Sequence, residues 1–86
     1  MQLKISKFGH ILISRPAGRE AYLAAHAYSL PKKIDRIELN FKGVKVLSPS
    51  WISEFVSLLR KDYPAIEIKF LNTQNPSVSQ SLDMIE

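Results

Sequence analysis

The chain contains no cysteine, so neither a disulfide nor a thiolate zinc site can stabilise it. No apolar run approaches the roughly 20 residues that a helix needs to cross a bilayer. The N-terminus alternates polar and apolar residues and lacks the continuous apolar stretch of a signal peptide. We therefore expect a soluble, cytoplasmic protein with no membrane attachment.

Motifs for catalysis are also missing. The three glycines are isolated, and no glycine-rich phosphate loop or nucleophile motif occurs. The eight acidic residues are scattered, without a close pair suited to acid–base chemistry. His10 and His26 have no carboxylate partner in the local sequence, and a metal site would need further ligands. We expect a protein that is not an enzyme and that needs no metal or cofactor.

What the chain does contain is the composition of one small folded domain. Its 86 residues, 45% of them hydrophobic, suffice for a single core, so we expect one domain over residues 1–86. The net charge of +4 favours an acidic partner or nucleic acid. A nucleic-acid binder usually clusters its Lys and Arg on one face, whereas here these residues are spread along the chain.

Alternation of polar and apolar residues predicts four strands. The first covers residues 3–8, and residues 10–14 form a more buried second strand. Gly9 offers a turn between the two, so we expect them to form a hairpin. Residues 37–41 and 66–70 show the same alternation and predict the third and fourth strands.

The first predicted helix covers residues 17–30. Ser14 can cap its free amides, and Pro16 suits a first turn because its missing N–H is no loss there. The small residues of this segment would let the helix lie close to a sheet. The apolar stripe expected from helical spacing consists of Ala21, Ala24, Ala25 and Tyr28.

Two further helices complete the order ββαβαβα. After a connection at residues 44–47, Ser48, Pro49 and Ser50 open an amphipathic helix that runs to about Lys61, and a short helix follows Asn75 and Pro76. Each strand–helix–strand unit has the length of a parallel crossover. The predicted fold class is α/β: a four-stranded mixed sheet with its helices packed mainly on one face.

The most informative segment is the junction between the third strand and the second helix. In an open α/β sheet, ligands and partners meet the carboxyl ends of the strands, where helices begin. Ser48 and Ser50 lie where free amides and the helix dipole could hold a phosphate. Serines at such positions are mostly caps, so both interpretations stay open.

Three more residues near the helix starts have a structural and a functional interpretation. Trp51 either packs against the sheet or anchors an interface, because tryptophan is enriched in binding hot spots. Glu54 gains from the helix dipole without needing a function. Arg15 either binds an anion at the start of the first helix or is solvated.

In the order and spacing of several segments, the sequence resembles the STAS-like domains of unknown function found in bacteria, distant relatives of anti-sigma factor antagonists. The similarity extends from about Ile11 to the end of the chain, and the fold of that family has the order ββαβαβα. The segments that carry it are residues 14–15, 39–44, 48–55 and 72–78.

The resemblance implies a binding module. In anti-sigma factor antagonists, the loop and helix after the central strand contact an ATP-binding, histidine-kinase-like regulator, and phosphorylation of a serine there breaks the complex. The corresponding position is Pro49, between Ser48 and Ser50, and the aspartate common at the strand end is Asn40 here. The Asp-Glu pair common in the family reads Ser53-Glu54.

Our leading hypothesis is a regulatory domain that binds another protein through residues 47–55 and neighbouring loops. The partner-binding or regulatory residues are then Ser48, Ser50, Trp51, Glu54, Arg15 and Asn40. Two alternatives remain: a small basic protein that contacts nucleic acid, and a binder of anions or nucleotides at the helix N-termini.

Overall fold

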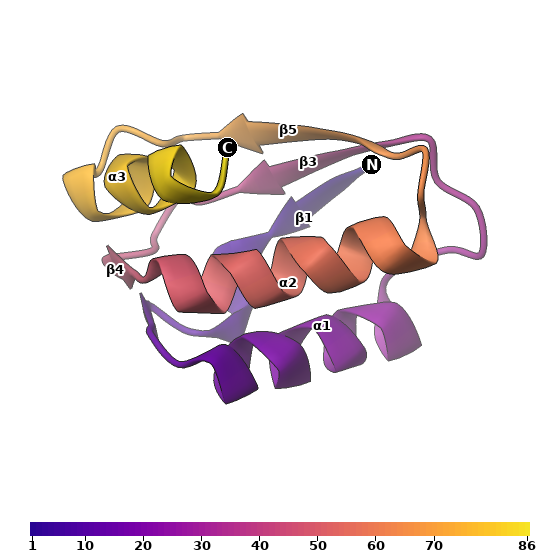
Figure 1. Cartoon of the computed structure of the whole chain (residues 1–86), viewed down its shortest axis with the longest axis horizontal. Helices are drawn as coiled ribbons and strands as arrows, with labels where there is room; N and C mark the ends of the chain where they lie inside the picture. Colours follow the sequence, from indigo (N-terminus) through magenta and orange to yellow (C-terminus); the bar gives the residue numbers. More distant parts are fainter.

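The computed structural model describes residues 1–86 and shows three helices beside short strands (Figure 1). One 3-10 helix, η1, follows the first strand. The elements in chain order are β1 Gln2–Lys4, η1 Ile5–Phe8, β2 Ile11–Leu12, α1 Arg15–Tyr28, β3 Arg36–Asn40, β4 Val46–Leu47, α2 Pro49–Asp62, β5 Glu67–Leu71 and α3 Pro76–Ile85.

A parallel sheet of three strands supports the fold, in the order β1-β3-β5. Ile37 and Leu39 of the central strand β3 are fully buried, whereas Glu38 between them is only half-buried. This alternation leaves one face of the sheet polar and directs the other face toward the helices. All three helices lie on that second face (Figure 1), as expected from the sequence.

The predicted hairpin and the predicted single mixed sheet of four strands are wrong. β1 pairs with β3, while β2 pairs with β4 in a separate two-stranded ribbon, and every pairing is parallel. Ile5 explains the difference, because it is fully buried and the 3-10 turn that places it in the core ends the first strand at Lys4. The chain therefore cannot fold straight back from β1 to β2.

β4 was expected to be a connection rather than a strand. A turn in which the N–H of Val44 donates to the carbonyl of Phe41 precedes it, with Gly43 at a φ of 89°. The N–H groups of Lys45 and Val46 then both donate to the carbonyl of His10, at 2.8 and 3.1 Å. Two paired residues are too short for alternation to be visible in a sequence.

The helix starts follow the sequence closely. Ser14, Ser48 and Asn75 each accept a hydrogen bond from a backbone N–H in the first turn, at 3.2, 3.2 and 2.8 Å. A proline stands in the first turn of all three helices. These caps satisfy amides that would otherwise lack a partner.

The buried face of α1 differs from the predicted stripe. It consists of Gly18, Ala21, Tyr22 and Ala25, whereas Ala24 is exposed and Tyr28 is 90% exposed. The buried face is rotated relative to the predicted stripe because Gly18 lies against the backbone of α2. A β-carbon at this position would lie 2.4 Å from the carbonyl oxygen of Trp51. Glycine is required here by the close approach of the two helices.

Aromatic rings fill the space behind this contact. Trp51 and Phe55 stack with a centroid distance of 5.4 Å and an interplanar angle of 7°. The ring of Tyr22 meets Phe55 edge-on at 5.5 Å, and Phe8 lies 5.8 Å from Phe55. The packing of α1 on α2 therefore decides where the largest side chains of the core lie.

We expect Gly18→Ala to destabilise the protein. Alanine improves helix propensity by about 1 kcal/mol, but the clash with Trp51 must push the helices apart at a net cost of about 1–3 kcal/mol. Urea denaturation measures the change, and Ala24→Gly on the exposed face of α1 measures the propensity effect alone. A stabilised Gly18→Ala protein would show that the close approach is not required.

Tyr22 also links α1 to the end of α2. Its hydroxyl donates a hydrogen bond of 2.7 Å to Oδ2 of Asp62. Burial raises the pKa of Tyr22 above the ordinary tyrosine value, and the hydrogen bond and negative charge of Asp62 raise it further. The tyrosine is thus held in its neutral form.

The raised pKa predicts a loss of stability in alkali. Below a pH of about 10 the tyrosine is protonated in both states; above it the unfolded state ionises first, so the free energy of unfolding falls as pH rises. We expect Tyr22→Phe to cost about 1 kcal/mol at neutral pH and to weaken this alkaline fall. Urea denaturation at pH 7 and pH 10.5 measures both effects. Tyr28→Phe, at an exposed position, serves as the control and should change neither.

Candidate functional site

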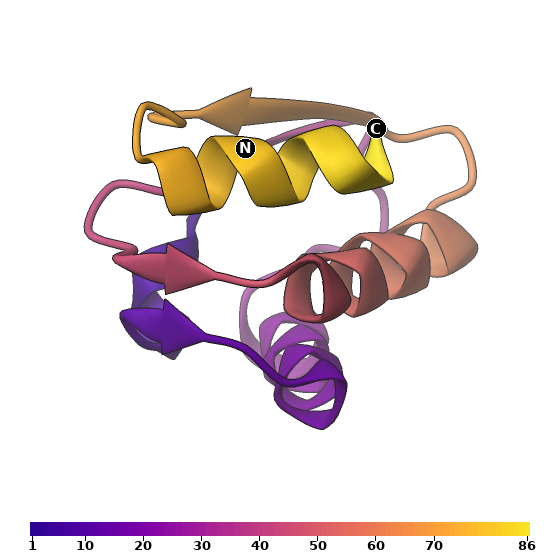
Figure 2. The ribbon, with the colours of Figure 1, turned by 60° about the vertical axis from the view of Figure 1, so that its left-hand side comes forward.

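The three helices begin at the same end of the molecule. Strands β1, β3 and β5 finish at this end, which we call the carboxyl edge (Figures 1 and 2). None of the helices has an acidic residue in its first turn. Because the N-terminus of a helix carries a partial positive charge, the edge attracts negative groups even before side chains are considered.

Side-chain charges reinforce this polarity. Five basic residues lie at or next to this edge: Lys4 at the end of β1, Lys42 after β3, Lys45 before β4, and Arg15 and Arg19 in the first two turns of α1. Glu54, in the second turn of α2, is the acidic residue beside Arg15 and Arg19. Basic residues that are far apart in the sequence are therefore brought to one edge by the fold.

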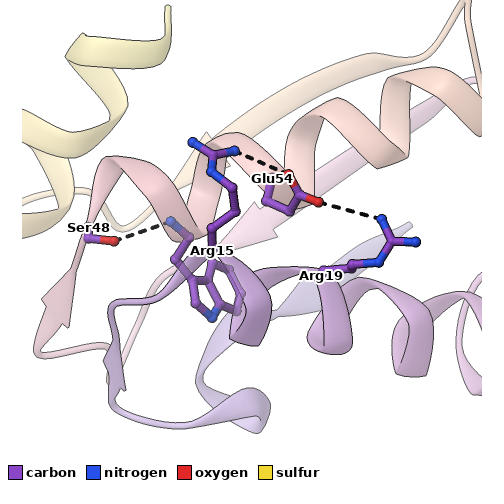
Figure 3. A network of polar contacts seen from close by, with 5 residues as sticks. Arg15, Arg19, Ser48 and Glu54 are labelled. Carbon is purple, nitrogen blue, oxygen red and sulfur yellow. Dashed lines mark hydrogen bonds and ion pairs between the residues drawn. The ribbon is translucent and has the colours of Figure 1, made fainter.

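Glu54 of α2 is paired with two arginines of α1. Its Oε1 accepts from Arg15 at 3.1 Å, and its Oε2 lies 3.7 Å from Arg19, one turn further along α1 (Figure 3). Arg15 and Glu54 were predicted separately as candidate residues, whereas their pairing and the role of Arg19 were not predicted. Arg15 and Arg19 are four residues apart and therefore share one face of a helix, and this spacing could have indicated that they act together.

The two serines of the junction have different environments. The Ser48 hydroxyl accepts from the N–H of Trp51 (Figure 3) and donates to the carbonyl of Ile13, so it caps α2 and also ties it to the segment after β2. Ser50 is exposed, and its side chain makes no hydrogen bond to the protein. Of the two, Ser50 alone has a hydroxyl free for modification or for a partner.

We expect Ser48→Ala to lower the free energy of unfolding by about 1 kcal/mol, because the cap of α2 is lost. Ser50→Ala should change it by less than about 0.5 kcal/mol, since the exposed side chain has no partner to lose. Thermal or urea unfolding followed by circular dichroism compares the two. Equal effects would contradict the assignment of Ser48 as the cap.

Trp51 requires a correction. It was included in the predicted docking surface, but it is only 1% exposed and lies in the aromatic core against Phe55. Trp51 lies on the part of α2 that faces α1, where Gly18 allows the two backbones to approach each other. The packing interpretation of Trp51 is the one that the structure supports.

An exposed aliphatic patch lies beside the start of α2 and was missed by sequence analysis. Ile11 is 63% exposed, Ile13 56% and Val46 40%. Ile11 and Val46 are register partners in the β2–β4 ribbon, and Leu12 between the two isoleucines points inward at 3% exposure. We call Ile11, Ile13 and Val46 the ribbon surface. The alternate spacing of Ile11 and Ile13 could have indicated that both face outward, but residues 10–14 were predicted to form the more buried strand.

Asn40 lies at the carboxyl edge in a row of amide side chains, and its hydrogen bonds reach none of the junction residues. Its Nδ2 donates to Oε1 of Gln2 at 3.0 Å, and its Oδ1 accepts from Nδ2 of Asn72 at 2.7 Å. The same oxygen accepts from the N–H of Lys42 at 2.9 Å. Asn40 is 8% exposed and connects the end of β3 to β1 and to the loop after β5 from within.

The histidines do not converge. His10 hydrogen-bonds the carbonyl of Gly43 at 2.8 Å, and His26 lies 3.9 Å from Asp62 at the other end of α1. No three His, Asp or Glu side chains come together in a geometry that could hold a metal ion. Nor does any helix combine the length and apolar character that crossing a membrane requires.

The fold and this edge define a small α/β domain with parallel strands, three helices on one face and a basic edge where the helices begin. A family model described as a STAS-like domain of unknown function matches residues 24–78, more than half of the chain, and the chain belongs to this family. The matched region includes Asn40 and the start of α2 and leaves β1, β2 and Arg15 outside. No curated protein and no solved structure matches the chain.

Proposed function

We propose that this STAS-like domain is a cytoplasmic, non-enzymatic regulatory module that binds another protein at the carboxyl edge. The binding surface consists of the ribbon surface together with Ser50 at the start of α2. It modifies the surface expected from residues 47–55 and neighbouring loops, because Leu47, Trp51 and Phe55 are buried.

The exposed ribbon surface is the observation that carries this proposal. Single exposed apolar residues are common on monomers, but here Ile11 and Val46 are exposed register partners and the exposed Ile13 directly follows β2. Burying a Val or Ile side chain completely gains about 1.5–3 kcal/mol. Covering these three partly exposed side chains would therefore contribute on the order of 3 kcal/mol to binding.

Charge at the edge specifies the chemistry of the partner. The basic residues of the edge and three helix N-termini complement an acidic surface, which would also accelerate association. A protein offers acidic and apolar groups together. Nucleic acid would satisfy the charges but would leave the aliphatic residues without a suitable partner. Among the aromatic residues, only Tyr28, at the opposite end of α1, is largely exposed and available for stacking on a base.

Ser50 supports a regulated interaction. Resemblance to anti-sigma factor antagonists suggests an ATP-binding, kinase-like partner and a phosphorylation switch next to Pro49. Ser50 is exposed and lies in the first turn of α2, where a phosphate would be stabilised by the helix dipole. Phosphorylation there would add roughly −1.5 to −2 charge beside the ribbon surface. The added charge would repel an acidic partner.

We expect Ile11→Ser to reduce partner recovery about tenfold in quantitative co-purification from the native cell, since about half of a buried isoleucine's contribution is lost. Leu23→Ser is the matched control, because Leu23 is 52% exposed on α1 and lies outside the ribbon surface. Circular dichroism verifies that both variants stay folded.

Equal recovery with Ile11→Ser and Leu23→Ser would refute the ribbon surface as the binding site. Retention on DNA or RNA that weakens steeply with salt, and that is the same for the Ile11→Ser variant as for the unsubstituted protein, would instead favour the nucleic-acid alternative. Binding of phosphate or nucleotides that is weakened when Ser14 or Ser48 is substituted would favour the other alternative, a binder of anions or nucleotides at the helix N-termini.

A further inference from the structure

A polar hollow lies at the carboxyl edge between the loops that follow β3 and β5. Its volume is about 510 Å³, within the range of about 300–1,000 Å³ that is typical of small-ligand pockets. Only two of the nine residues that line it are hydrophobic, and both of these are largely buried. The residues used below are Lys4, Asn40, Lys42, Asn72, Gln74 and Asn75.

Hydrogen bonds hold the walls of the hollow in place. Asn72 and the N–H of Lys42 both donate to the Oδ1 of Asn40, which joins the two loops across the floor. Asn75 fixes the opposite wall, because its Nδ2 donates to the carbonyls of Val44 at 3.2 Å and Lys45 at 2.9 Å. A hollow whose walls are already ordered loses little conformational entropy when a ligand enters.

The charges in the hollow have one sign only. Lys4 and Lys42 are part of its lining, no acidic residue is, and neither lysine forms an ion pair with a carboxylate. The ion pairs of the chain are made by arginines and His26 instead. An anion that enters the hollow could therefore accept charge-assisted hydrogen bonds from two lysines that have no carboxylate partner, next to the amide side chains.

We propose that this hollow binds a small ligand that carries an oxyanion, a phosphate or a carboxylate, on a polar body. Lys4 and Lys42 attract the oxyanion, and the exposed amides of Asn72 and Gln74 bond the polar remainder. An apolar ligand would find almost no apolar surface here. The hollow shares no residue with the ribbon surface or with Ser50, although its Lys4 and Lys42 also belong to the basic edge.

The test is a titration of the ¹⁵N-labelled protein, followed by NMR, with sodium phosphate and separately with sodium acetate. Sodium chloride at equal ionic strength controls for screening. We expect saturable shifts of the backbone amides of residues 42–43 and 72–75 with phosphate, acetate or both. Saturation by one anion alone assigns the hollow to that class of ligand.

The variant Lys4→Gln/Lys42→Gln should weaken this binding about tenfold or more, because two charge-assisted contacts are removed. Lys32→Gln/Lys33→Gln is the matched control, since it lowers the net charge equally in the loop after α1, outside the hollow. Non-saturating shifts, shifts centred on the starts of α1 and α2, or equal weakening in both double variants would each overturn the proposal.

Discussion

The contact between Gly18 of α1 and the backbone of Trp51 sets how closely the two long helices pack. No side chain fits between the two backbones, so the helices lie close and direct Trp51 and Phe55 into one aromatic core. The same approach brings Arg15 and Arg19 of α1 to Glu54 of α2. It therefore removes the only tryptophan from the surface and neutralises the acidic residue nearest to the start of α2.

Parallel strand direction has the second large effect. Every strand pairing is parallel, so each strand of the sheet ends where a helix can begin, and the three capped helix starts gather at one edge. The helix dipoles then add to the basic side chains near the edge, among them Lys4, Lys42 and Lys45. Basic residues that are scattered along the chain are thus brought to one edge of the molecule by the fold.

Two different surfaces result at this edge. The ribbon surface is apolar and is the proposed contact for a protein partner, whereas the hollow beside Asn40 is polar and basic and is the proposed site for a small anion. They are joined by the loop between β3 and β4, since Asn75 holds the carbonyls of Val44 and Lys45 just before Val46 of the ribbon. An anion in the hollow and a protein on the ribbon would therefore contact the two ends of one short loop.

The helices were predictable from the sequence, because Ser-Pro and Asn-Pro starts and helical spacing act over a few residues, and so were the α/β class and the family. The strand partners, in contrast, follow from the tertiary structure, since β2 and β4 are two residues each and their pairing joins Ile11 to Val46. It also decided that Trp51 is buried, that Ile11 is exposed and that Arg15 meets Glu54. These outcomes depend on how closely α1 approaches α2 and on which segments meet at the edge, and such long-range contacts leave no periodic pattern in the chain.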